Sequence, residues 1–141
     1  MANIHAFDEN VRTRYGGFQV DFGDTDIVSS EYVDMKNYDL VVGVALASHI
    51  DSDSIVTLTM YQATSTAGAD SAAVSSTIHT STGSTEAIAI TAQVRGEDLS
   101  TTTAFHYVGF VITSDDATNT TEGAGVLHQL RARYKQATLP A

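Results

Sequence analysis

The chain of 141 residues contains no cysteine, no tryptophan and a single proline, Pro140. Without cysteine, a disulfide framework, a thiolate nucleophile and a cysteine-based zinc site are all impossible. Because the proline stands at the far end of the sequence, it demotes none of the strands that the pattern predicts. A chain of this length buries about two-thirds of its surface on folding, which is enough for one self-sufficient core.

Basic residues and long apolar runs are also scarce. Seven Lys and Arg stand against 17 Asp and Glu, for a net charge of −10. This charge disfavours nucleic acid and anionic membranes, both of which attract basic surfaces. The longest apolar run, Leu40–Ala47, is far below the about 20 residues that span a bilayer, and "MANIHAFDEN" is no secretory signal. We expect a soluble protein made in a cytoplasm, with no nucleic-acid or membrane partner.

The sequence that remains shows the side-chain alternation of β-strands. In "DLVVGVAL" (39–46) both alternating faces are apolar, as in a central strand that is covered on two sides. In "SIVTLTMYQ" (54–62) one face is apolar and the other is polar, as in a half-buried sheet. A polar loop joins these two segments, which predicts that they form an antiparallel hairpin. Further strands are expected at 86–94, 104–113 and 124–134.

The segments between the strands are rich in turn formers. Residues 63–85 predict a long exposed loop with one weak strand at 74–79, and 96–99 predict a single helical turn. The glycines of "GAG" (123–125) are assigned to a turn. We therefore predict an all-β fold: a single antiparallel β-sandwich or small β-barrel over 31–141, with an extended N-terminal arm over 1–30 that carries short strands. The stretch "YVDMKNYD" (32–39) would be the bend between the arm and the body.

None of the residue patterns predicts catalysis or metal binding. The five histidines lack a metal-ligand spacing, although His106 and His128 could be neighbours across a sheet. Neither a Gly-x-Ser-x-Gly turn nor a phosphate-binding glycine loop occurs. The acidic pairs lie in predicted loops, where carboxylates commonly bond backbone amides of turns; they are Asp24 with Asp26, Asp51 with Asp53, and Asp115 with Asp116. We expect a protein that is not an enzyme and has no catalytic residue, metal or cofactor.

The few cations gather near the two ends of the sequence. This distribution is either the scatter expected of a small number or a sign that both ends face an acidic partner. On the second interpretation, the partner-binding residues are the terminal arginines with the aromatic residues of the arm: Arg12, Arg14, Tyr15, Phe18, Phe22, Arg131 and Arg133.

Four stretches occur in a distinctive order: "YVDMKNYDLVVGVAL", "SIVTLTMYQATSTAGAD", "AQVRGEDLSTTTAFHYVGFVIT" and "LRARYKQATLP". Over residues 31–140 this order resembles the decoration, cement or auxiliary head proteins of tailed phages. The resemblance implies a homotrimer on the outer capsid surface of the virion, where it clamps neighbouring subunits of the major capsid protein without catalysis.

A second interpretation is a carbohydrate- or cell-surface-binding β-sandwich of the fibre or adhesin type. Such a module needs exposed aromatic side chains that are clustered beside the acidic loops. The available aromatic residues are Tyr15, Phe18, Phe22 and Tyr61.

Overall fold

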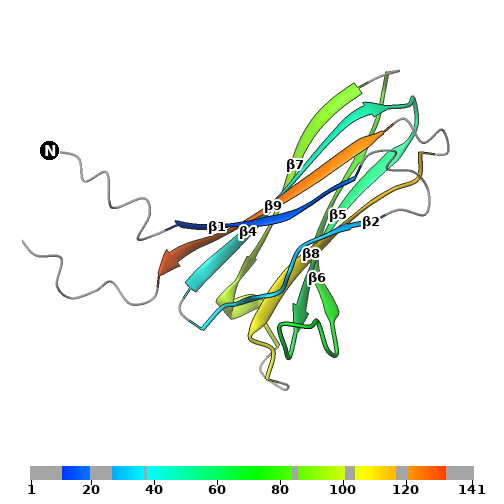
Figure 1. Ribbon diagram of the computed structural model, residues 1–141. Coiled ribbons are helices and arrows are strands. Elements are labelled where there is room, and N and C mark those ends of the chain that lie inside the picture. Colours follow the sequence, from blue (N-terminus) through cyan, green and yellow to red (C-terminus); the bar gives the residue numbers. More distant parts are fainter. Residues whose placement is uncertain are drawn as a thin grey trace, which may run out of the picture.

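The structure is a computed structural model that describes residues 11–19, 27–36, 38–83, 86–100, 104–116 and 121–132. Within these ranges it contains nine strands and one short 3-10 turn at Gly96–Asp98 (Figure 1). The strands are β1 (Val11–Gln19), β2 (Ile27–Ser29), β3 (Val33–Asp34), β4 (Tyr38–Ile50), β5 (Ile55–Ala63), β6 (Ala72–Thr80), β7 (Glu86–Arg95), β8 (Tyr107–Ser114) and β9 (Glu122–Ala132). The all-β prediction is confirmed. No helix of the described residues is long and apolar enough to cross a bilayer.

The strands form two antiparallel sheets that pack as a sandwich. Sheet A has the order β1-β9-β4-β7, and sheet B has the order β2-β8-β5-β6, with β3 also paired to β8. Figure 1 shows the long strands of the two layers running side by side, and β1 is the edge strand of sheet A beside β9. The edge strands β6 and β7 contact each other, as do β1 and β2. The two sheets are therefore in contact through their edge strands at both edges of the sandwich.

The predicted hairpin of β4 with β5 is wrong, because these consecutive strands belong to different sheets. The ladder between β4 and β7 shifts register between Ala47 and Ile50, and His49 has a left-handed backbone with φ of 56°. Asp53, in the following turn, has φ of 67°. A bulge of this kind bends and twists a strand, and here the chain leaves sheet A and enters sheet B.

The predicted long loop at 63–85 is also shorter than expected. Strand β6 occupies Ala72–Thr80 and pairs with β5 from Ile55 opposite Thr80 to Gln62 opposite Ala72. The weak strand predicted at 74–79 is confirmed and is longer than expected. Apart from Val74 and Ile78 its side chains are small or polar, so the apolar period is weak, and the full length of β6 follows from pairing with the backbone of β5.

Two strands lie within the region predicted as an arm. Strand β1 pairs with β9 from Val11 opposite Leu130 to Gln19 opposite Gly123, and β2 pairs with β8. Both strands are thus members of the sandwich sheets. Residues 1–10 and 20–26 lie outside the described residues.

The "YVDMKNYD" stretch forms a bend between the sheets. Val33 and Met35 are buried, and the N–H of Met35 donates to the carbonyl of His106 at 2.7 Å. The Asp34 side chain accepts from the N–H of Lys36 at 2.8 Å, which stabilises the turn. Apolar anchors therefore hold a polar turn that leads from β3 in sheet B to β4 in sheet A.

The core lies between the sheets and is built around Phe110 of β8, which is 1% exposed. Its ring lies against sheet A at Gly16 and Gly125, where any Cβ atom would collide with it. Gly43 makes the same room for Met60, since a Cβ there would lie 2.6 Å from the Met60 Sδ. The "GAG" glycines were therefore predicted wrongly as a turn: Gly123 and Gly125 belong to β9, and Gly125 makes room for an aromatic ring.

One polar side chain crosses this core. Gln129 of β9 is 2% exposed, and its Nε2 donates to the backbone carbonyl of Asp34 at 2.8 Å. A buried amide needs such a partner, because leaving it unbonded is costly. The bond joins the inner side of sheet A to β3 of sheet B.

Candidate functional site

The structure brings the two cationic segments of the sequence to one edge of sheet A. Arg12 and Arg14 lie in β1, and Arg131 lies in β9, its neighbour in the sheet. Arg12 stands opposite Gln129, two residues before Arg131. The structure describes the backbone of these strands but not the side chains of Arg12, Arg14, Tyr15 and Arg131, and Phe22 and Arg133 lie outside the described residues.

Phe18 is the predicted partner-binding residue whose side chain is described, and it is 55% exposed. Its register partner in β9 is Ala124, which stands opposite Leu46 of β4, and Leu46 is 45% exposed. The side chains of this row border an open hollow of about 270 Å³ on the outer face of sheet A. The rest of its lining is Ala47, Ser48, Ala87, Ile88, Glu122 and Gly123. Leu46 was not predicted as a surface residue, because it lies in a run that is apolar on both faces and was therefore interpreted as buried on both.

The hollow is apolar with one acidic rim. The Ser48 hydroxyl donates to the Glu122 carboxylate at 3.3 Å. An open, mainly apolar depression suits the side chain of another macromolecule better than a small substrate, which needs enclosure and several convergent polar groups. We therefore treat it as part of an interaction surface.

The outer face of sheet A continues from the hollow as an apolar band. We define the β4/β9 stripe as the outward-facing residues of the two central strands; they are Leu40, Val42, Val44 and Leu46 of β4 and Ala124, Val126, His128 and Leu130 of β9. None of the eight is fully buried, whereas the alternating residues Val41, Ala45 and Leu127 are. The prediction that β4 is a central strand is confirmed, whereas the predicted cover on both of its faces is not found among the described strands. Sheet B covers the inner face alone, and no described strand covers the outer one.

Two of the described acidic residues, Asp115 and Asp116, stabilise turns at one end of the sandwich. Asp115 accepts a hydrogen bond from the N–H of Ile55, and buried Asp116 accepts from the N–H of Asp51 at 3.2 Å and from the Thr121 hydroxyl. The prediction that these carboxylates bond turn amides is confirmed for this pair. Among the described residues, no group of three or more His, Asp and Glu is placed to hold a metal ion. Asp24 and Asp26 lie outside them.

The histidines do not form the pair that was suggested. His128 lies in β9 of sheet A and shares a hydrogen bond of 3.0 Å with the Thr13 hydroxyl of β1. His106 precedes β8 of sheet B, and its carbonyl bonds Met35. Sheet membership, which the sequence does not reveal, keeps these two side chains apart.

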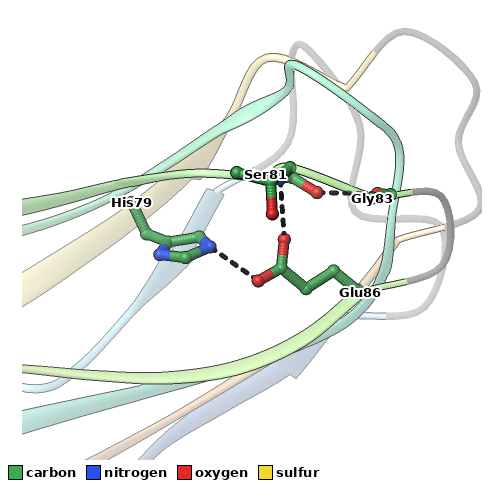
Figure 2. Close-up of polar contacts among 5 residues, drawn as sticks. His79, Ser81, Gly83 and Glu86 are labelled. Atoms are coloured by element: carbon green, nitrogen blue, oxygen red, sulfur yellow. Dashed lines mark hydrogen bonds and ion pairs between the residues drawn. The ribbon is translucent and has the colours of Figure 1, made fainter.

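A third histidine links the sheets at their other edge. Nε2 of His79 in β6 lies 3.1 Å from Oε1 of Glu86 in β7, and the N–H of Thr82 donates to Oε2 at 3.0 Å (Figure 2). The Ser81 hydroxyl, the Thr82 amide and His79 together hold the pKa of Glu86 below its ordinary value. Because β6 belongs to sheet B and β7 to sheet A, the cluster ties the two layers together.

Two of the four aromatic residues considered for glycan binding, Phe18 and Tyr61, do not lie together, whereas the side chain of Tyr15 and all of Phe22 are outside the described part of the structure. Phe18 lies on the outer face of sheet A, and Tyr61 lies in β5 of sheet B. The two layers of the sandwich separate them.

No family model matches the chain, and no curated protein matches its sequence. Among solved structures, the PBSX exported protein XepA has a TM-score of 0.52 and 14% identity over 90% of this chain and 39% of its own. The infectious bursal disease virus VP2 subviral particle gives 0.50 and 11% over 87% of this chain and 33% of its own. The xylan-binding module CBM15 gives 0.45 and 11%, with 95% of each chain covered.

The likenesses to XepA and to the VP2 particle support the β-sandwich fold alone, since a sequence identity of 14% or less does not carry a function across. The chain spans about two-fifths of XepA and one-third of the VP2 chain.

Proposed function

We propose that this chain is a non-enzymatic decoration protein of a tailed-phage virion. It is made in the host cytoplasm and binds the outer surface of the icosahedral head as a homotrimer. There it contacts neighbouring subunits of the major capsid protein and clamps them together. The proposed role requires no cofactor, nucleic acid or membrane.

The observation that carries the proposal is the apolar outer face of sheet A. Monomeric proteins seldom expose a contiguous apolar surface of more than a few hundred Å², and a larger one marks a site of interaction. Here Phe18 and Leu46, each about half exposed, border a hollow at one end of that face. Two further points support a place in a virion: the order of motifs over 31–140 and a fold shared with the VP2 subviral particle.

The physics of a clamp fits a small rigid sandwich. A protein that binds the assembled shell but not its free subunits stabilises the shell by mass action. Several weak contacts made at once by one oligomer add through avidity, so no single contact has to be strong. The cationic segments at the edge of β1 and β9 give an otherwise acidic chain one place to meet an acidic shell.

Co-sedimentation with heads tests the proposal. Heads are purified from the phage that encodes this chain, after deletion of its gene, and the chain is added back. We expect it to pellet with the heads to saturation and to raise the temperature at which they lose DNA. Failure to pellet at saturating concentration would overturn the proposal.

Charge variants locate the contact. The double variant Arg12→Glu with Arg14→Glu is expected to weaken head binding at least about tenfold, since like charges facing each other in an interface cost several kcal/mol. Lys36→Glu reverses one charge at an exposed turn near the bend, half of the change in the double variant, and is the control for a charge reversal outside β1. Equal binding by both variants would remove these arginines from the interface.

A glycan-binding role would give a different result. Thermal-shift measurements with xylan and other oligosaccharides, with and without calcium, should leave the melting temperature unchanged. A saturable rise would favour the adhesin-type interpretation instead.

A further inference from the structure

The β4/β9 stripe forms a continuous apolar surface because its residues stand directly opposite one another. Leu40 pairs with Leu130, Val44 with Val126, and Leu46 with Ala124. Opposed side chains of an antiparallel pair have Cβ atoms about 5 Å apart, so they touch along the whole band. Seven of the eight residues are apolar, and His128, the exception, is bonded to Thr13.

The stripe is free of negative charge in a chain whose net charge is −10. On β7 the outward residues beside it are Ala89, Thr91, Gln93 and Arg95. Glu122 is the first acidic residue on the outer face of β9, and it lies beyond the last stripe row. Two copies of so acidic a chain repel each other unless they meet where carboxylates are missing. The stripe allows such an approach.

The outer face of sheet B lacks the same character. Its central positions carry hydroxyl groups, with Thr57 and Thr59 of β5 opposite Thr113 and Val111 of β8. Exposed Ile27 of β2 and Ile78 of β6 stand at the two edge strands of the same row, with Thr113 and Thr57 between them. The hydroxyl group of an outward threonine is well solvated by water, whereas burying valine and leucine side chains away from water is favourable. The two faces of the sandwich are therefore not equivalent: the exposed apolar residues of sheet B are separated by threonines, whereas those of sheet A form a continuous band along two central strands.

The area of the face is close to what a specific contact between copies needs. Four strands about 4.8 Å apart, with outward residues about 6.7 Å apart over four rows, cover about 19 Å by 27 Å, or about 500 Å² in projection. A specific interface buries at least about 1,000 Å² in total, or about 500 Å² on each partner. The face meets the lower end of that range, which predicts an association that depends on protein concentration.

We propose that the β4/β9 stripe is the surface through which copies of this chain pack against one another, stripe to stripe. The surface has the anatomy of such a contact: an apolar centre with small and polar residues beside it on β7. Because the apolar band is two strands wide and runs along the strands, it suits an axis shared by several copies. The number of copies, three, rests on the proposed function, whereas the surface does not.

Light scattering on the purified chain tests the inference. At high concentration we expect a mass near three times the 15.0 kDa of one chain, falling toward one chain on dilution. Val44→Glu places a carboxylate in the centre of the stripe of every copy and should weaken association at least about 100-fold, because like charges in an interface cost several kcal/mol. Thr59→Glu makes the same change at an outward position of sheet B and should leave the mass unchanged.

Two controls keep the experiment decisive. Leu46→Lys changes a stripe residue that is 45% exposed, so it disturbs the single sandwich less and should still weaken association. Far-ultraviolet circular dichroism shows whether each variant keeps its β-structure. A wild-type chain that stays at the mass of one copy at every concentration, or folded stripe variants that associate like wild type, would overturn the inference.

The outcomes also separate this inference from the proposed function. A dimer that Val44→Glu abolishes keeps the stripe as the contact but contradicts three-fold assembly. Loss of self-association in Val44→Glu with retained head pelleting shows that the stripe joins copies rather than copy to capsid. If Val44→Glu no longer pellets with heads but still self-associates, the stripe does not form the contact between copies, and the inference is contradicted.

Discussion

Adding one methyl group at Gly125 tests how the core is assembled. Gly125 lies on the inner side of β9, where the ring of Phe110 rests against the backbone. A Cβ atom there would collide with that ring and would lie 2.8 Å from Cδ1 of Ile112. The ring cannot swing aside, because Phe110 is 1% exposed and Gly16 borders it as well.

The expected loss follows from two opposing effects. Forcing an extra methyl group into a packed core costs about 1–3 kcal/mol, and here two rigid neighbours must move, so the upper half of that range applies. Alanine also lowers the conformational entropy of the unfolded chain, which stabilises the folded state by about 0.4–1 kcal/mol. Gly125→Ala should therefore lower the free energy of unfolding by about 1–2 kcal/mol. For a domain of this size that lowers Tm by about 3–8 °C.

Thermal and urea unfolding measured by circular dichroism provide the assay. Gly83→Ala is the matched control, because no atom lies within 4 Å of the Cβ position there, and it should leave stability unchanged or slightly raised. Phe110→Leu removes ring atoms from the contact, so it should cost less in the Gly125→Ala background than alone. Additive effects of the two changes, or a Gly125→Ala protein as stable as wild type, would refute this account of the core.

Two further changes test the polar links. Because the pKa of Glu86 is lowered on folding, its contribution to stability is complete above the unfolded pKa and is lost as pH falls through the folded one. Glu86→Gln should therefore lose less Tm than wild type between about pH 5 and pH 3, and equal losses would contradict the role given to His79 and Ser81. Thr121→Val removes the hydroxyl that donates to buried Asp116, which should cost about 1–3 kcal/mol, while Thr113→Val at an exposed strand position should change unfolding by less than about 0.5 kcal/mol.

Local patterns predicted the strands well. The apolar period in 39–46 and 54–62 marks β4 and β5, and the turn formers at 96–99 mark the short helical turn. The position of β6 was predicted at 74–79 but its length was underestimated, because most of its residues are small or polar and its ends depend on pairing with β5. A strand whose order comes from a neighbour's backbone leaves little trace in its own side chains.

The candidate surface was predicted only in part. Phe18 was selected as an aromatic residue of the predicted arm, and it is exposed beside the hollow. Leu46 was overlooked because a strand apolar on both faces predicts cover on both, whereas the outer face of sheet A has none in the described residues. Periodicity reports how apolar each face is, but not what lies against it.

The sequence by itself determined the class of fold and the chemistry of the chain: alternating apolar residues make strands, and the lack of cysteine removes every thiol-based site. Only the tertiary structure decided which strands are neighbours. It placed β4 between β9 and β7 instead of beside β5, and it set Gly16 and Gly125 against Phe110. The reason is that alternation is a property of neighbouring residues, whereas sheet order and close packing depend on contacts between residues far apart in the chain.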